Sequence, residues 1–231
     1  MPASDPRGAD DVPPHHPMIS RRTDFSVEFR ETDDPLHAPS TRVVEALINA
    51  MEAKSPFLRG HSHRVGAVAA ALAAELDLPD EEVERIRLAG HLHDIGKIGV
   101  RETILDKPEQ LTAEEFAHVQ QHVNIGLNIL EPLPQLLLIR DYIAHHHERI
   151  DGSGYPGSLR GNAVSLGGRI LGAADALDAC TSPRAYRDAM TLDEAIVWLR
   201  SLGPRGICPT VLPALERIAK KGQVLVFIND L

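Results

Sequence analysis

The sequence predicts an all-α helical bundle, and three observations support that fold class. From Thr41 onward, apolar residues recur at spacings of three and four, which is the period of an amphipathic helix. Six prolines fall between the later periodic segments, at positions 132, 134, 156, 183, 204 and 209. The chain shows neither an alternation of strand-like and helix-like segments nor an internal repeat.

Each predicted helix has its own signal. The segment 41–53 carries an apolar stripe, and 65–76 is rich in alanine, which suits a closely packed inner helix. We expect Asp80 to cap the next helix, which runs toward His93. Thr112 and Glu115 form a capping box for a fourth helix. Four more helices are predicted, at about 135–147, 166–180, 191–200 and 210–221.

The first forty residues differ in composition from the rest. They hold seven of the 17 prolines, and eight acidic residues against four basic ones. We therefore predict a flexible, mostly disordered N-terminal segment over 1–40 and a folded domain over 41–231. Alternating apolar residues at 25–29 and 224–228 form two strand-like patches, and they suggest a small terminal β ribbon.

Composition and charge narrow the partners. The chain has 231 residues and a formal net charge of −9, which disfavours binding to a nucleic acid polymer. No apolar run is long enough to span a bilayer, so we expect no membrane insertion. Only Cys180 and Cys208 are present, which is typical of a reducing compartment, and we expect a cytoplasmic protein.

Histidine is the residue type that is out of proportion. The chain has 12 histidines, nine of them between His61 and His147. Several histidines and acids are separated by about the length of a helix and a turn, so an antiparallel bundle brings them to one end. These candidate ligands are His61, His93, Asp94, His122, His146, His147 and Asp175. Five imidazoles and two carboxylates suffice for two divalent metal ions, and this donor set suits Fe, Mn or Zn.

Two blocks of sequence resemble a known family. The block from His93 to Lys97 reads His-Asp-Ile-Gly-Lys, and the block 146–156 runs from His-His-Glu to Gly-Tyr-Pro. They are similar to the HD-GYP subgroup of the HD phosphohydrolase superfamily, and the resemblance covers about 50–221. It implies an HD-type helical bundle, a di-iron or di-manganese centre, and the hydrolysis of cyclic di-GMP to linear pGpG and, after a second cut, GMP.

The resemblance also assigns roles to single residues. One metal would take His61, His93, Asp94 and Asp175, and the other would take Asp94, His122, His146 and His147. Asp94 would therefore bridge the two metals, and the two metals would hold the hydroxide that attacks the phosphorus. Some members bind a third metal through a carboxylate four residues before the first histidine. Phe57 stands there, so we predict two metals.

The remaining site residues concern the substrate. Lys97 is placed to oppose the charge on a phosphate oxygen, so we treat it as catalytic together with Asp94. We expect Gly154, Tyr155, Arg184 and Arg187 to contact the cyclic dinucleotide, because the loop is glycine-rich and arginine binds phosphate through two donors.

Two other functions remain open at this point. The alternatives to a cyclic di-GMP phosphodiesterase are another di-metal HD enzyme, such as a nucleotide phosphohydrolase, and a cyclic di-GMP-binding interaction module with little activity. The complete ligand set and Lys97 favour an enzyme. A signalling protein partner and a homodimer are both open.

Overall fold

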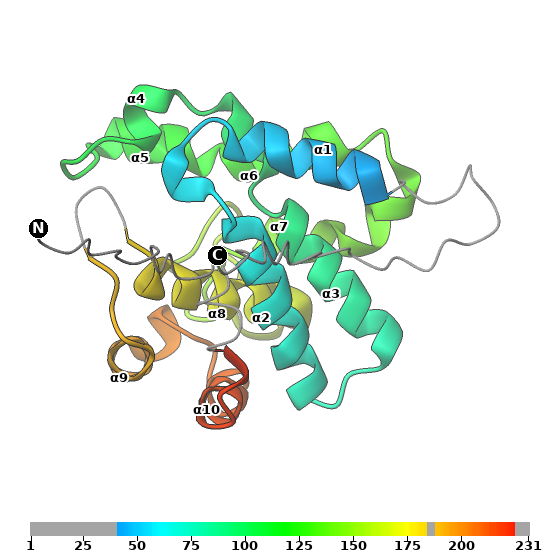
Figure 1. The fold of residues 1–231 in the computed structure, drawn as a ribbon, viewed down its shortest axis with the longest axis vertical. Helices are drawn as coiled ribbons and strands as arrows, with labels where there is room; N and C mark the ends of the chain where they lie inside the picture. Colours follow the sequence, from blue (N-terminus) through cyan, green and yellow to red (C-terminus); the bar gives the residue numbers. More distant parts are fainter. Residues whose placement is uncertain (1–40, 184–187, 225–231) are drawn as a thin grey trace, which may run out of the picture.

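The computed structural model describes residues 41–183 and 188–224, and these form a bundle of short helices (Figure 1). The α-helices are α1 Thr41–Glu52, α2 His61–Glu75, α3 Asp80–Leu92, α4 Glu102–Leu105, α5 Ala113–Gln120, α6 His122–Leu130, α7 Arg140–His145, α8 Leu166–Thr181, α9 Leu192–Ser201 and α10 Leu212–Lys220. Short 3-10 helices connect them, namely η1 Pro56–Leu58, η2 Ile95–Gly99, η3 Pro134–Ile139, η4 Gly161–Ala163 and η5 Gly203–Arg205.

The all-α prediction is confirmed, and three local expectations need correction. Helix α2 begins at His61 because Gly60 turns the chain in the left-handed region, with φ of 69°, just before it. Asp80 is the first residue of α3 and does not cap it, since Pro79 holds the capping position. The helix predicted at about 135–147 is divided into η3 and α7.

Helix α2 lies at the centre of the bundle and packs against α3, α8 and α10 (Figure 1). Both of its valines and the alanines at 69, 70 and 73 are buried, which lets the neighbouring helices approach closely. Helix α8 is similarly buried along most of its length. The first residue of α2 and the middle of α8 are thereby held at fixed positions, and both carry candidate metal ligands.

Some expectations fall outside the described residues. The flexible segment 1–40 and its strand-like patch lie there, as do Arg184, Arg187 and most of the C-terminal patch. Val224 is described, and it is fully buried. Between residues 41 and 224, apart from 184–187, the only β pairing is an isolated bridge between Asp151 and Arg160.

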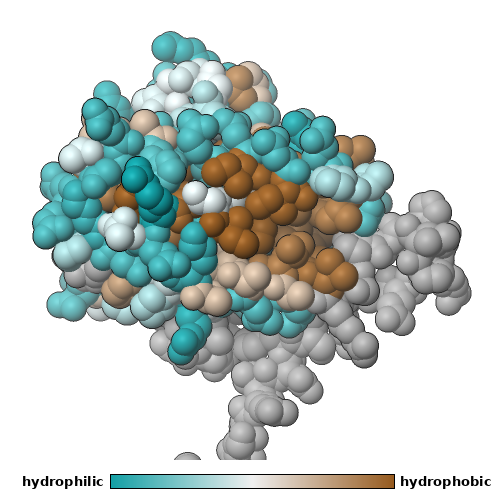
Figure 2. All heavy atoms as spheres, turned by 90° about the horizontal axis from the view of Figure 1, so that it is seen from above, coloured by the Kyte–Doolittle hydropathy of each residue, from teal (hydrophilic) through white to brown (hydrophobic). Residues whose placement is uncertain are grey.

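The surface gives two further facts. Among the described helices, none combines the length and hydropathy that a membrane span requires. The side of the bundle formed by α1, α4, α5 and α6 shows an apolar area within polar surroundings (Figure 2). Large hydrophobic side chains exposed on or beside these helices include Val43, Ile98 and Phe116.

Gly96 lets η2 touch α6 backbone to backbone. A Cβ atom on Gly96 would lie 1.8 Å from the carbonyl oxygen of His122 and 2.5 Å from the amide nitrogen of Gly126. Real Cβ atoms do not approach backbone so closely, so any larger residue must push η2 away from α6. The two elements carry Lys97 and His122, and this contact therefore sets the spacing of site residues.

We expect Gly96→Ala to destabilise the fold by about 3 kcal/mol, because overpacking against rigid backbone costs that much. The melting temperature should fall by roughly 6–12 °C for a domain of this size. Thermal unfolding followed by circular dichroism measures this. Gly99→Ala is the matched control in the same 3-10 helix, because its Cβ would meet only the flexible side chain of Ile125. Equal melting temperatures for the two variants would contradict the account.

Candidate metal centre

Six of the seven candidate ligands lie where helices begin or end. His61 is the first residue of α2, and His122 is the first residue of α6. His93 and Asp94 directly follow α3. His146 and His147 directly follow α7. The seventh, Asp175, lies in the middle of α8. The helix ends converge, as the sequence spacing predicts.

Asp94 lies between two groups of imidazoles and is 1% exposed. Its Oδ2 atom is 3.2 Å from Nε2 of His61 and 3.4 Å from Nε2 of His93. Its other oxygen, Oδ1, is 3.4 Å from Nε2 of His122. The two carboxylate oxygens therefore face different histidine groups, which is the arrangement that a bridging ligand needs.

The two groups have the composition of metal sites. One comprises His61, His93 and Asp94, and the other comprises Asp94, His122, His146 and His147; within each group the ligand atoms lie within 4.8 Å of one another. Asp175 adjoins the first group, since its Oδ1 atom is 3.6 Å from Nε2 of His61 and 4.0 Å from Nε2 of His93. The structure thus brings all seven candidates together.

Backbone carbonyl groups fix the orientation of three of the imidazoles. Nδ1 of His93 is 2.7 Å from the carbonyl oxygen of Gly90. The same contact, three residues back along the chain, occurs from His122 to Val119 at 2.8 Å and from His146 to Ile143 at 2.6 Å. A carbonyl oxygen only accepts, so each Nδ1 carries the proton and each Nε2 presents a lone pair to the centre.

His61 is held instead by a carboxylate that the sequence analysis did not single out. Its Nδ1 atom is 2.7 Å from Oδ2 of Asp178, and Nε of Arg64 donates to the other oxygen of Asp178 at 2.5 Å. Such a carboxylate behind a histidine orients the ring and raises its basicity as a ligand. The signal was present in the sequence, because Asp175 and Asp178 are three residues apart on one helix face.

Burial and neighbouring charges prepare these groups for binding a cation. Burial, together with the nearby His93 and His122, lowers the pKa of His146 to about 3, and burial lowers the pKa of His147 well below its usual value. Burial alone would raise the pKa of Asp94, but the neighbouring His93 and Lys97 outweigh burial and hold that pKa well below the usual range. His146 and His147 are thus neutral and Asp94 is anionic, as ligands must be.

His61 is the exception among the imidazoles. Burial opposes its protonation, but the hydrogen bond to Asp178 and the nearby carboxylates of Asp178 and Asp94 outweigh burial and raise the pKa of His61 to about 9. A cation that binds Nε2 of His61 therefore replaces a proton there.

Within the described part of the chain, several buried polar atoms at the centre have no hydrogen-bond partner. They are Nε2 of His61, Nε2 of His93 and Oδ1 of Asp94, all buried. Buried polar atoms without a partner are costly, and groups of imidazole and carboxylate ligands without thiolate are typical of divalent transition-metal sites. The residues present therefore fit bound metal ions.

The Gly-Tyr-Pro loop is fastened to the ligand-bearing segment. A Cβ atom on Gly154 would lie within 2.5 Å of the backbone of residues 147–149, so only glycine fits there. The Tyr155 amide donates to the carbonyl oxygen of His147 at 3.2 Å. The Tyr155 ring then lies 4.7 Å from the His147 ring, centroid to centroid.

Glu148 stabilises this loop. Its buried carboxylate accepts hydrogen bonds from the backbone amides of Gly157, at 2.5 Å, and Leu159, at 2.9 Å. Burial raises the pKa of Tyr155 above its usual value, and the charges of Asp175 and Asp94 raise it further. The phenol is therefore neutral and lies at the wall of the metal centre. Gly154 and Tyr155 both lie beside the centre, where we expected substrate contacts.

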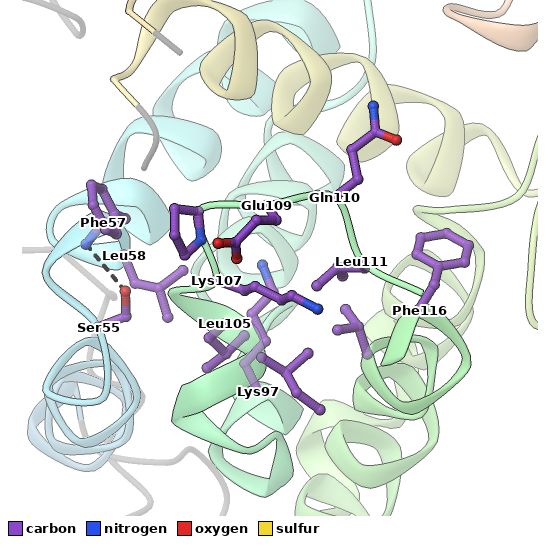
Figure 3. A pocket seen from close by; sticks show the side chains of 13 residues that line it. Ser55, Phe57, Leu58, Lys97, Leu105, Lys107, Glu109, Gln110, Leu111 and Phe116 are labelled. Atoms are coloured by element: carbon purple, nitrogen blue, oxygen red, sulfur yellow. Dashed lines mark hydrogen bonds between the residues drawn. The ribbon is translucent and has the colours of Figure 1, made fainter. Parts of the chain in front are cut away.

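Lys97 adds a positive charge at the centre. Its Nζ atom donates to Oδ2 of Asp94 at 2.5 Å, and its side chain is 17% exposed. It also lines a cavity of about 750 Å³ that lies beside the centre (Figure 3). The sequence analysis missed this cavity, because its lining comes from turns and helix starts with no shared pattern.

Comparison with known proteins gives the family. A family model described as an HD domain matches residues 45–205, so the chain belongs to the HD domain family. Its Gly-Tyr-Pro block and its relatives place it in the HD-GYP group of that family.

Two curated relatives illustrate the group. A cyclic di-GMP phosphodiesterase of Thermotoga maritima is 38% identical over 195 residues, which cover 84% of this chain and 52% of the relative. A 3'3'-cGAMP-specific phosphodiesterase of Vibrio cholerae is 37% identical over 175 residues, which cover 76% of this chain and 38% of the relative. The chain thus spans about half, or less, of the length of these relatives.

Solved structures agree on the fold. A crystal structure of a V. cholerae phosphodiesterase specific for cyclic GMP-AMP is 32% identical with a TM-score of 0.50, covering 77% of this chain and 40% of that one. An HDGYP protein of Bdellovibrio bacteriovorus gives a TM-score of 0.60 at 19% identity, covering 78% of this chain and 60% of that one, and this likeness shows the fold alone.

We expect Asp178→Asn to weaken metal binding, because the amide holds the His61 ring less firmly and no longer raises its basicity. Loss of such a partner typically costs roughly 10–100-fold in metal affinity. Titration of the metal-free protein with Mn²⁺ measures the affinity. Asp193→Asn, on the exposed first turn of α9, is the matched control. An Asp178→Asn variant that folds and binds Mn²⁺ as tightly as this control would contradict the role given to Asp178.

Proposed function

We propose that the chain is a metal-dependent phosphodiesterase that cleaves a cyclic dinucleotide, with cyclic di-GMP as the preferred substrate and pGpG and then GMP as products. The observation that carries this proposal is the shared carboxylate of Asp94, buried between two groups of imidazoles beside a cavity lined by Lys97. The relatives named as cyclic di-GMP phosphodiesterases support the substrate.

The proposed ligands divide into two sets that share one residue. His61, His93, Asp94 and Asp175 would hold one divalent ion, and Asp94, His122, His146 and His147 would hold the other. Fe or Mn suits this donor set best. A pair of such ions supplies an activated water near neutral pH and neutralises charge on the phosphate.

The chain's own residues have distinct tasks in this proposal. The ammonium group of Lys97 stands beside Asp94 and would stabilise the negative charge that develops on a phosphate oxygen. Tyr155, held against His147 by the loop that Glu148 fastens, would position the substrate and exclude water. Arg184 and Arg187 stay predicted substrate contacts, and both lie outside the described residues.

A second substrate has a specific observation in its favour. A V. cholerae relative that is 37% identical is described as specific for 3'3'-cGAMP. The mixed dinucleotide has the same backbone and differs from cyclic di-GMP by one base. Turnover of cyclic di-GMP, 3'3'-cGAMP and cyclic di-AMP by the same preparation separates the two proposals.

The remaining expectations concern the setting of the enzyme. Cys180 and Cys208 are both buried. A chain of 231 residues with only two cysteines is typical of a reducing compartment, and we propose the cytoplasm. A signalling protein partner and a homodimer stay predictions.

The function is tested by anaerobic preparation with Fe²⁺ or Mn²⁺, metal analysis, and turnover of cyclic di-GMP. We expect two metal ions per chain and measurable hydrolysis. Asp94→Ala should lose both metals and activity, because one carboxylate serves both sites. Lys97→Ala should keep the metals and lose roughly 10²–10³-fold in kcat, as expected when one charge-stabilising donor is removed.

Two outcomes would oppose the proposal. An Asp94→Ala variant with full turnover would exclude the metal mechanism. Loss of metal in Lys97→Ala would show that Lys97 holds Asp94 in place and does not act on the substrate.

A further inference from the structure

The cavity of about 750 Å³ is bounded by three stretches of chain: the turn at 55–58, residues 104–111, and helix α5 (Figure 3). Most of its wall is apolar. The aromatic and aliphatic lining residues include Phe57, Leu58, Leu105, Pro108, Leu111 and Phe116. A volume of this size is ample for a nucleobase with its ribose, and flat apolar walls favour a planar ring.

The cavity and the metal centre share residues. Lys97 lines the cavity and donates to Asp94. Val119 lines it too, and its carbonyl oxygen accepts from Nδ1 of His122. The Phe116 ring lies 6.1 Å from the Tyr155 ring, edge to face. A nucleotide with its phosphate at the metal centre can therefore extend a base into this cavity.

Two charged side chains stand within the apolar lining besides Lys97. Lys107 donates from Nζ to both carboxylate oxygens of Glu115, at 2.8 and 2.7 Å, and its third proton remains for a ligand. Glu109 makes no hydrogen bond or ion pair with any residue in the described part of the chain, and its carboxylate points inward (Figure 3). The neighbouring Gln110 side chain points away from the cavity (Figure 3).

The charges of Lys107 and Glu109 complement the hydrogen-bonding groups of guanine and conflict with those of adenine. The Watson–Crick edge of guanine presents the O6 acceptor and then the N1 and N2 donors. An ammonium group suits O6, and a carboxylate accepts from N1 and N2 together. Adenine presents a donor where guanine has O6 and an acceptor at N1, so both charges would face groups of the wrong kind.

We propose that this cavity binds one purine of the cyclic dinucleotide and that Glu109 selects guanine over adenine, an inference that rests on the proposed function. Phe57 and Phe116 supply apolar contact that any purine can use. Glu109 supplies the discrimination, with Lys107 beside it.

The test compares kcat/KM for cyclic di-GMP and cyclic di-AMP in the Mn²⁺-loaded full chain and in Glu109→Gln. The wild type should prefer cyclic di-GMP. The variant should lose about tenfold or more with cyclic di-GMP, since a site built to accept two donors discriminates strongly. An amide can donate to N1 of adenine and accept from N6, so the variant should keep or gain activity with cyclic di-AMP.

Cyclic di-IMP, which lacks the N2 amine, provides an independent measurement. The wild type should hydrolyse it less efficiently than cyclic di-GMP, and Glu109→Gln should narrow that difference. Glu114→Gln is the matched control, because Glu114 is exposed on α5 and does not line the cavity. It should keep the wild-type ratio of cyclic di-GMP to cyclic di-AMP turnover.

The outcomes separate the two proposals. If the wild type hydrolyses cyclic di-GMP but Glu109→Gln keeps the ratio of the control, Glu109 does not read the base and only this inference fails. If the Mn²⁺-loaded wild type hydrolyses no cyclic dinucleotide, both the proposed function and this inference are contradicted.

Discussion

The structure depends on one buried carboxylate. Asp94 is 1% exposed, and its two oxygens face separate groups of imidazoles. A carboxylate in that position is costly unless positive charge surrounds it. Lys97 supplies one positive charge from the protein itself. Cations held by the two histidine groups would supply the remaining positive charge. The surrounding helices can be understood as the framework that brings these donors to Asp94.

The framework works because the ligands sit at helix ends. His93, His122 and His146 each follow the last turn of a helix, and each ring is held by the carbonyl oxygen three residues before it. His61 begins its helix after the turn at Gly60, and its ring is held by the Asp178 carboxylate instead. The orientation of every anchored ring thus follows from local backbone geometry or from one added carboxylate.

The helices and the clustering of the candidate ligands were predictable because both leave a periodic or spaced signal. The stripe over 41–53 and the gaps between His61, Asp94 and His122 required no knowledge of packing. The division of 135–147 and the close contact at Gly96 were not predictable, since they depend on how close two backbones come. The cavity beside Lys97 was not predicted either, because it depends on how separate stretches of the chain pack together. Nothing in the sequence distinguishes Glu109 from the other glutamates, and only the fold places it in the wall of the cavity.

The most direct test of the central claim is a crystal structure of the Mn²⁺-loaded protein with anomalous data at the Mn edge. The account predicts two anomalous peaks per chain, about 3.5–4 Å apart, one on each side of the Asp94 carboxylate. A single peak, or peaks that do not involve Asp94, would contradict it.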